Sequence, residues 1–472
     1  MREKIHKLTK TNYLSWVILM LVLLADALDV IDATITNIAA PTIAANLHGG
    51  ESLIKWLGPA YMLAMGVLLV VGGRLGDKFG QRRLFLIGMG GFTLASAVAG
   101  FALTPAMLIV ARVAQGAFGA LLLPQGMAIM TKSFDKDMLA KAFSLFAPTL
   151  GLSSIGGPVL AGFIISANLF GLSWRPIFLI NLIIGVIGLF LAVKILPRDD
   201  KGDQPIVIDS WASGVLAAAM FGLLYGLIEG STNGWGAVPI ASIVIGVLFF
   251  IAFAHRQHTA TDPLIAPSLL KNQGFTSGML VGLIGFAAVS GLVLVLSLFL
   301  QEGLHVSARD ASVGLLPMTA GIIGASFAAM GGLVAKLGRK LVFIGLVVDL
   351  IGCGWVLTLV AFSGTNVSLW ALAPALLITG IGIGLSFATI PTLALSDAKP
   401  EEAGSASGAF STMQQLASAT GVAVVTSVFF QAAGSGMAHA IKVTLIVVLA
   451  ATALSLPLVA LMPRKATAEP TL

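Results

Sequence analysis

Long apolar runs separated by short polar segments make up most of this chain. Because a run of about 18 apolar residues can cross a bilayer as a helix, each run predicts one membrane span. The gaps are too short for a soluble domain, and the first run is too long for a cleavable signal sequence. Fourteen spans are expected, at residues 15–40, 53–73, 83–103, 105–130, 143–166, 176–195, 211–229, 237–254, 275–300, 312–335, 340–362, 370–395, 404–431 and 439–461.

Composition supports an all-α integral membrane protein. Hydrophobic residues make up 57% of the chain and charged residues 10%, with a mean hydropathy of +0.99. A soluble domain is about 25% charged. Cys353 is the single cysteine and lies in an apolar run, so neither a disulfide framework nor a metal site is expected. No phosphate-binding loop sequence occurs, which argues against ATP-driven transport, and no cofactor is expected.

The net charge of +6 is interpreted as a sign of membrane topology rather than of nucleic-acid binding. An excess of Lys and Arg in cytoplasmic loops is the usual orientation signal. With both termini in the cytoplasm, most basic residues fall on that side, and Arg112 falls inside a span. We therefore expect a multi-pass protein of the inner (plasma) membrane with both termini cytoplasmic. The basic residues on the external side are then Lys55, Arg175, Arg309 and Lys442.

Two similar segments indicate an internal repeat. Residues 73–83 (GRLGDKFGQRR) follow the second span, and residues 331–340 (GGLVAKLGRK) follow the tenth. Parallel six-helix halves are a known transporter architecture, and a repeat about eight spans apart places two additional helices between the halves. The predicted domains are residues 1–195 as the first six-helix bundle, 196–274 as a linker with two additional transmembrane helices, and 275–472 as the second six-helix bundle.

The first of these segments resembles the loop signature of the major facilitator superfamily, G-x-L-x-D-x-x-G-x-R-R. Four further segments resemble motifs of its fourteen-helix drug:proton antiporter family, and their order matches that family over nearly the whole chain. The resemblance implies the major facilitator fold and multidrug efflux of the quaternary-ammonium-resistance type by alternating access. The four segments are 32–41 (DATITNIAAP), 112–116 (RVAQG), 157–162 (GPVLAG) and 174–181 (WRPIFLIN).

The chain departs from the family's motifs at four positions. Ser153 and Ala161 stand where the motif of the fifth span usually has glycine. Pro176 replaces a usual tryptophan, and Gln414 stands where an arginine is frequent. These departures bear on the choice of substrate rather than on the fold.

Three carboxyl groups, Asp26, Asp29 and Asp32, lie three residues apart in the first span. On a helix they share an arc of about 140° with Thr36 and Asn37, so this stripe must face protein or water. Three neighbouring carboxylates in a low dielectric cannot all ionise, so the cluster should hold at least one proton near neutral pH and titrate as a unit. A proton antiporter needs this property, and a cation could compete for the same groups. The alternative is that these aspartates only pair with a neighbour.

Arg112 is expected at the same depth as Asp32, about 10–12 Å from the outer ends of their helices. A guanidinium group keeps its proton. We therefore hypothesise that its approach releases the proton of Asp32 and so couples conformation to protonation. A static structural salt bridge is the alternative.

Several other side chains are candidates for binding the substrate. Trp56 and Tyr61 could stack on aromatic or cationic ligands. Asp349 falls in mid-span, where it either faces the cavity or is covered by the two additional helices. Glu229 lies at an external helix end, where interfacial solvation is the alternative to a cation vestibule. The predicted substrate-binding set is Asp29, Asp26, Trp56, Tyr61, Gln115, Asp349 and Glu229.

Two motifs are expected to control conformation. The family resemblance implies that Asp77 meets the start of the thirteenth span, near residues 404–407, and holds the inside closed. An anion at a helix N-terminus contributes up to about 1–2 kcal/mol, and the alternative is a charge cluster that only sets topology. In the fifth span, proline can kink the helix and small residues allow close helix packing. This span is therefore expected to act as a hinge on which the two halves move. The latch residues are Gly73, Asp77, Gly80, Arg82 and Arg83, and the antiporter-motif residues are Gly157, Pro158 and Gly162.

The sequence thus predicts a secondary active transporter and not an enzyme. We expect a monomeric, proton-coupled exporter of small lipophilic, cationic drugs or antiseptics, with protons and the lipid bilayer as its other partners and no nucleic acid. One alternative is a proton-coupled transporter of a specific metabolite, such as an amino acid or an organic ion. A further alternative is an antiporter-like subunit of a redox proton pump, which the lack of a mid-helix lysine disfavours.

Overall fold

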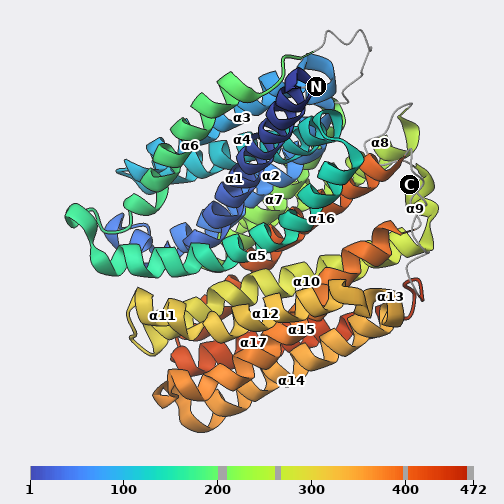
Figure 1. The fold of residues 1–472 in the computed structure, drawn as a ribbon. Coiled ribbons are helices and arrows are strands. Elements are labelled where there is room, and N and C mark those ends of the chain that lie inside the picture. The colour runs from blue at the N-terminus through green and yellow to red at the C-terminus, as the bar shows by residue number, and fades with distance from the viewer. Residues whose placement is uncertain (1, 200–209, 261–266, 397–401, 465–472) are drawn as a thin grey trace.

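The structure is a computed structural model that describes residues 2–199, 210–260, 267–396 and 402–464. Within these ranges the chain is almost wholly helical and contains no strand (Figure 1). The first six long helices are α1 (Arg2–Asn46), α2 (Gly50–Phe79), α3 (Gln81–Gly100), α4 (Pro105–Ser133), α5 (Lys136–Ala167) and α6 (Pro176–Ile195).

The remaining helices follow a linker. They are α7 (Ser210–Asn233), α8 (Ala237–Thr259), the short α9 (Pro267–Lys271), α10 (Gln273–Leu298), α11 (Ala308–Gly314), α12 (Leu316–Ala328), α13 (Val334–Leu337), α14 (Arg339–Ser363), α15 (Leu369–Leu395), α16 (Ala403–Ala433) and α17 (Met437–Val459).

The helices agree with the expected all-α membrane fold. Thirteen helical stretches of the described residues are long and apolar enough to cross a membrane. The fifth predicted span corresponds to α5, whose described apolar part is Gly156–Ala167. The expected all-α membrane class is therefore confirmed.

Several helices extend past the predicted spans, and the backbone of two spans shows features that the apolar pattern did not predict. The first was expected to end at residue 40, but α1 continues through Pro41 to Asn46 because a proline within a long helix only bends it. The tenth, predicted as one run over 312–335, corresponds to one apolar stretch, Ala308–Leu337, which is interrupted at Leu315 between α11 and α12 and by a π-helical segment, Ala329–Leu333, between α12 and α13. Gly332 has a φ of 119° inside that segment, a backbone conformation that glycine tolerates without steric cost.

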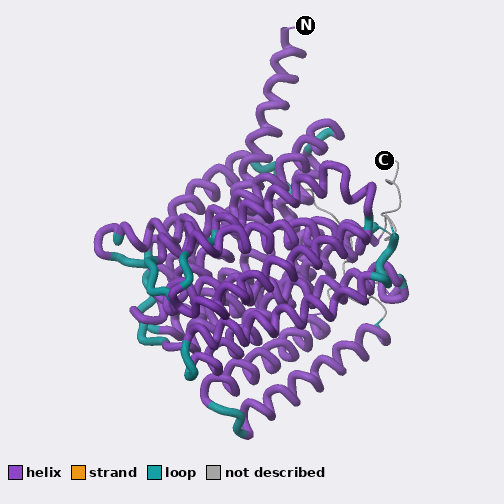
Figure 2. The backbone as a smooth tube through the Cα atoms, turned by 90° about the horizontal axis from the view of Figure 1, so that it is seen from below, coloured by secondary structure: helices purple, strands orange, loops and turns teal. Residues whose placement is uncertain are grey.

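Each half packs mainly within itself. In the N-terminal half α2 and α3 pack on α4, α1 packs on α5, and α3 packs on α6. In the C-terminal half α12 and α14 pack on α15, while α10 packs on α16 and α17. Helix α7 packs on α2 of one half, on α16 of the other, and on α8. Figure 2 shows the first turns of α1 extending beyond the bundle.

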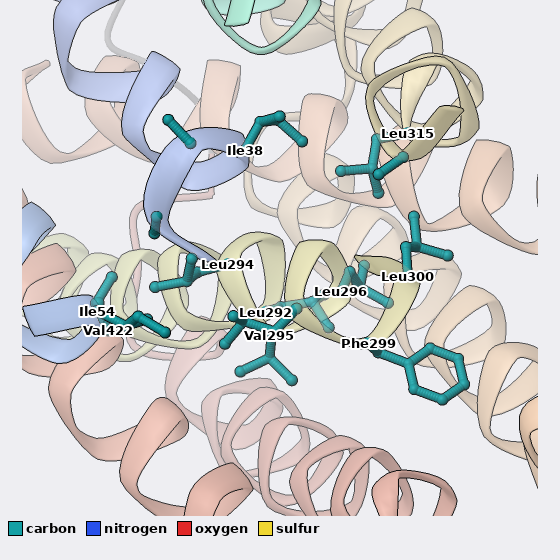
Figure 3. Close-up of a cluster of buried hydrophobic side chains, with 14 of the residues drawn as sticks. Ile38, Ile54, Leu292, Leu294, Val295, Leu296, Phe299, Leu300, Leu315 and Val422 are labelled. Carbon is teal, nitrogen blue, oxygen red and sulfur yellow. The ribbon is translucent and has the colours of Figure 1, made fainter. Parts of the chain in front are cut away.

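The apolar core joins the two halves directly at one end of the molecule and is largely divided at the other, where a smaller cluster of α7 and α8 residues bridges Val67 of α2 and Leu416 of α16. At the end where α1 meets α2, one buried cluster includes Ile38 and Ile54 of the first half and Leu294 and Val422 of the second (Figure 3). At the opposite end, one cluster belongs to α1–α6 with its flanking residues, and another belongs to the C-terminal half. The halves are therefore closed against each other at the end that the charge pattern predicts to be external.

Candidate functional site

A buried ion pair lies at the centre of the N-terminal half. Asp32 of α1 and Arg112 of α4 are both 0% exposed, and Arg112 Nη1 donates to Asp32 Oδ2. Gln115 Nε2 and Asn181 Nδ2 donate to Asp32 Oδ1 at 3.0 and 2.7 Å. This carboxyl group thus accepts hydrogen bonds from three side chains on α4 and α6, an arrangement that suits its ionised form because a carboxylate is an acceptor only.

The guanidinium group of Arg112 is held from several sides but retains one unused donor. Its Nε donates to the carbonyl oxygen of Leu57 at 3.2 Å, and Nη1 also donates to Gln115 Oε1 at 3.0 Å. The ring of Tyr61 lies 4.4 Å from its central carbon. Its Nη2 is buried without a partner, a costly arrangement for a charged donor. Arg112 can therefore donate from Nη2 to a second oxygen atom while it stays bonded to Asp32.

The other two aspartates of the stripe have different surroundings. The Tyr61 hydroxyl of α2 donates to Asp29 Oδ1. A Cβ at position 119 of α4 would lie 2.6 Å from that oxygen, so Gly119 leaves the room that Asp29 needs. Asp26 is 3% exposed, and its Oδ2 has no hydrogen-bond partner. Of the three carboxyl groups, Asp32 thus has three hydrogen-bond donors, Asp29 has one, and Asp26 Oδ2 has none.

Local sequence explains why these helices come so close. A Cβ at position 116 of α4 would collide with the carbonyl oxygen of Tyr61, so Gly116 allows α2 and α4 to pack with their backbones together. The RVAQG motif thus carries an arginine and a glutamine that bind Asp32, followed by the glycine that admits α2. Its residues work together because all three face the same side of α4.

The antiporter motif on α5 contacts both halves. A Cβ at Gly157 would lie 2.9 Å from the carbonyl oxygen of Ile31 on α1. A Cβ at Gly162 would lie 2.7 Å from the carbonyl oxygen of Ala308 and 2.9 Å from Ser312 Cβ on α11. One glycine therefore packs α5 against its own half, and the other packs it against the opposite half, at the closed end.

A cavity of about 570 Å³ lies between the halves. Helices α1, α2 and α5 line one side, and α10, α11, α12, α15 and α16 line the other. Phe286 and Phe387 meet edge to face on its wall, with ring centroids 4.3 Å apart. Asn37, Gln414 and Pro158 are also on the wall. The described lining residues are apolar or uncharged polar, and none carries a formal charge.

The predicted substrate-binding side chains do not line this cavity. Asp29, Asp26, Tyr61 and Gln115 belong to the carboxylate cluster inside the N-terminal half. Trp56 packs on Phe221 of α7, with ring centroids 6.0 Å apart. A role for these residues in substrate binding stays a prediction.

The two acidic residues of that set lie in other parts of the molecule. Glu229 accepts from Asn233 at 2.7 Å near the end of α7. Asp349 is buried in α14, where Cys353 Sγ lies 3.5 Å from Asp349 Oδ1 and Thr452 of α17 also bonds it. Asp349 therefore lies inside the C-terminal half, among α14, α15 and α17, rather than on the wall of the described cavity.

The loop between α2 and α3 is anchored to α6 and to the chain that follows it. Arg82 Nη2 donates to the carbonyl oxygen of Val193 at 2.7 Å. Asp199 accepts from the backbone N–H groups of Arg82 and Arg83 at 2.8 and 3.0 Å, and so caps α3. Gly80, with a φ of 97°, forms the turn.

The predicted latch contact lies outside the residues whose side chains the structure describes. This applies to Asp77 and to the start of α16 at Gly404. Gly73 lies on the same helix as Asp77. A Cβ atom at position 73 would lie 3.9 Å from Pro124 Cβ of α4. The latch role of this loop therefore stays a prediction.

Sequence reasoning missed three of these polar groups as functional candidates. Asn181 was noted only as part of a motif, yet it is a lone amide in an otherwise apolar span, a signal that could have identified it. Asp199 follows α6 directly in the linker. Lys55 was counted as an external charge, although its spacing of four from Glu51 on a helix indicated an ion pair.

Comparison with known proteins confirms the predicted major facilitator fold. Residues 22–422 match the Major Facilitator Superfamily. The chain is 37% identical to the probable actinorhodin transporter of Streptomyces coelicolor, over 89% of this chain and 73% of that protein. It is 32% identical to the puromycin resistance protein of Streptomyces alboniger, over 88% and 81%. It is also 32% identical to the cephamycin export protein of Amycolatopsis lactamdurans, over 87% and 84%.

Among solved structures, the crystal structure of a peptide transporter POT in complex with sulfate is similar in fold. Its TM-score is 0.68 and its sequence identity is 16%, over 94% of this chain and 95% of that chain. At this level of identity the likeness concerns the fold alone.

Proposed function

We propose that this chain, which belongs to the major facilitator superfamily, exports small lipophilic molecules in exchange for protons. It is a multi-pass membrane protein and a secondary transporter, not an enzyme. Similar proteins named for the export of, or resistance to, antibiotics support efflux. The proposal includes a monomer in the inner (plasma) membrane, with both termini cytoplasmic and a substrate that carries positive charge.

The observation that carries the proposal is the buried ion pair between Asp32 and Arg112. One guanidinium group neutralises one carboxylate. Asp32 is the carboxylate that pairs with Arg112, and it also accepts hydrogen bonds from Gln115 and Asn181. In the described contacts, Asp29 accepts from a neutral hydroxyl group and Asp26 Oδ2 has no partner. The arrangement with least buried net charge therefore has Asp32 ionised and protons on Asp29 and Asp26.

The conformation supports a direction of proton movement within this proposal. The halves are closed at the predicted external end, so a proton that leaves Asp32 here is released toward the cytoplasm. Along α1 toward the cytoplasm, Asp29 lies about 4.5 Å beyond Asp32, and Asp26 lies about 4.5 Å beyond Asp29. When the external side opens, separation of Arg112 from Asp32 lets Asp32 bind a proton from outside. Formation and breakage of one ion pair then couple proton import to the conformational cycle.

The cavity between the halves has the size and chemistry of a site for a lipophilic molecule. Its volume of about 570 Å³ falls within the roughly 300–1,000 Å³ of drug-sized sites. Its apolar and aromatic wall can bury a hydrophobic body, and its hydroxyl and amide groups can bind polar substituents. A positive charge on the substrate would be balanced by Asp29 only once that group has lost its proton; Asp29 lies one turn along α1 from Ala33 on the cavity wall.

Proteoliposomes with an imposed pH gradient test this assignment. We expect the gradient to accelerate movement of a quaternary ammonium dye above the rate in protein-free liposomes. An uncharged lipophilic dye of similar size tests the cationic part of the proposal, because equal gradient-driven movement of both dyes would remove the preference for charge. Gradient-driven movement of amino acids or organic anions, with both dyes unaffected, would instead favour a metabolite transporter.

The aromatic wall of the cavity gives a second expectation. Phe387→Ala removes one ring of the Phe286–Phe387 pair, and an aromatic contact contributes about 0.5–1.5 kcal/mol beyond its buried area. The substrate concentration for half-maximal transport should therefore rise up to about tenfold, without a change in the pH dependence. Phe362→Ala, at an 88% exposed phenylalanine of α14, is the matched control. An unchanged half-maximal concentration in Phe387→Ala would place the substrate elsewhere.

A further inference from the structure

A lysine that the proposed transport cycle does not use is buried at the closed end of the molecule. Lys55 lies in the first turns of α2, and its side chain is 0% exposed. Removing an ammonium group from water costs several kcal/mol unless the protein supplies partners. The partners that stabilise Lys55 in this position therefore indicate what it holds together.

The partners of Lys55 come mainly from the inserted helix α7. Its Nζ lies 3.1 Å from Thr232 Oγ1, 3.3 Å from Ser231 Oγ and 3.4 Å from Glu51 Oε2. Ser231 and Thr232 donate their own hydrogens to the carbonyl oxygen of Ile228, at 2.9 and 2.8 Å. Their lone pairs are thus left to accept from Lys55, and the three N–H donors of the ammonium group have three acceptors.

The C-terminal half reaches the same point through α16. Ser427 Oγ lies 2.8 Å from Ser231 Oγ and 2.5 Å from the carbonyl oxygen of Ala423, so its one hydroxyl hydrogen is shared between these two acceptors. The ring of Phe430 lies 5.1 Å from Lys55 Nζ, close enough for a cation–π contact. Lys55 therefore joins three elements that belong to the first half, the inserted pair and the second half.

Helix α7 follows this seam between the halves over much of its length. Leu224 and Ile228 of α7 are buried with Ala419 and Ala423 of α16, and Trp56 of α2 packs on the same cluster. Nearer the other end of α7, a second cluster combines its residues with Val67 of α2 and Leu416 of α16. The inserted helix is thus a packed part of the boundary that must separate when the external side opens.

We propose that Lys55 latches the external gate through Ser231 and Thr232 of α7 and through Ser427 and Phe430 of α16. In this proposal the inserted helix α7 is part of the external gate, because its hydroxyl groups stabilise the buried ammonium group of Lys55. The inference rests on the alternating access of the proposed function, but on neither its proton coupling nor its substrate.

The contacts also indicate where the gate opens. Lys55 holds α7 to α2 through two hydroxyl acceptors, whereas α16 contributes one hydroxyl bond and one ring contact. The weaker side is expected to separate first. Helix α7 should therefore move with the N-terminal half, and α16 should move away from both.

External accessibility of a residue behind the latch tests this proposal. Val422 of α16 is 2% exposed and lies beside Ile54 in the closed core (Figure 3). With Cys353→Ala removing the native thiol, Val422→Cys reports opening to a membrane-impermeant maleimide added outside intact cells. Lys55→Met keeps an unbranched side chain but removes the charge. When Lys55→Met is added, we expect the cysteine at position 422 to be labelled about ten times faster than without it. This corresponds to a shift of about 1.4 kcal/mol in the equilibrium between the closed and open gate.

Further variants separate the latch from general destabilisation. Lys442→Met, which removes a lysine near the start of α17 on the same face, should leave labelling unchanged. The double substitution Ser231→Ala and Thr232→Ala keeps Lys55 but removes its partners on α7, and should also accelerate labelling. If Lys55→Met fails to fold, the double variant decides alone.

Two results would overturn the latch. One is labelling of Lys55→Met at the parent rate. The other is parent-rate labelling of the double variant, which would remove α7 from the gate. Because labelling needs neither a pH gradient nor a substrate, failure here is distinguishable from failure of proton-coupled export.

Discussion

Asp32→Asn should abolish export driven by a pH gradient while leaving passive exchange of substrate across the membrane. The amide is nearly the same size as the carboxyl group and its oxygen still accepts from Arg112, so the helices should keep their packing, at a cost in stability because the buried guanidinium group loses its carboxylate. It cannot bind and release a proton, so the step that the proposal assigns to Asp32 is lost. Gradient-driven transport in proteoliposomes should fall to the protein-free rate, whereas counterflow of labelled against unlabelled substrate should persist.

A control with an exposed carboxyl group shows whether the effect belongs to the buried one. Asp310→Asn neutralises an exposed residue of α11 and should transport as the parent does. Elution as a single species in detergent shows that both variants are folded. Gradient-driven transport by Asp32→Asn at the parent rate would remove Asp32 from the coupling mechanism.

Arg112→Ala should have the largest effect on stability. It leaves Asp32 buried without its cationic partner, and breaking a buried ion pair by removing one member costs about 3–5 kcal/mol. That cost is a large part of the 5–15 kcal/mol by which folded domains are usually stable. We expect a lower yield and a lower midpoint of thermal unfolding in detergent.

Arg112→Lys separates charge from geometry. A lysine restores a cation but lacks the donor arrangement with which Arg112 binds Asp32, Gln115 and the carbonyl oxygen of Leu57. Stability should therefore recover largely, whereas gradient-driven transport should stay impaired. Full recovery of both properties would favour a static salt bridge, the alternative to a coupling role.

The number and order of the helices could be predicted because each span is a local property of the chain. Apolar runs identify spans whatever their neighbours are, and the repeated loop segment placed two additional helices between the halves. Details that depend on the backbone were harder to predict. The continuation of α1 through Pro41 and the π-helical break at Gly332 follow from how a helix tolerates a proline or a glycine in its packed context.

The site was predictable where one helix contains it and unpredictable where several helices meet. The spacing of Asp26, Asp29 and Asp32 fixed their common face, and the depth of Arg112 allowed its pairing with Asp32. Asn181 of α6 completes that site, but no sequence pattern shows that α6 packs there. The cavity wall depends on contacts between the halves, so residues such as Phe387 could not be assigned to it from local pattern alone.

In the proposed mechanism Asp32 couples proton import to substrate export, and substrate-driven proton movement tests this coupling most directly. Proteoliposomes with a pH-sensitive dye inside, no imposed pH gradient and a substrate gradient should show proton movement opposite to the substrate. Asp32→Asn should move substrate down its gradient without moving protons. Equal proton movement in the parent and in Asp32→Asn, at equal substrate flux, would contradict the account.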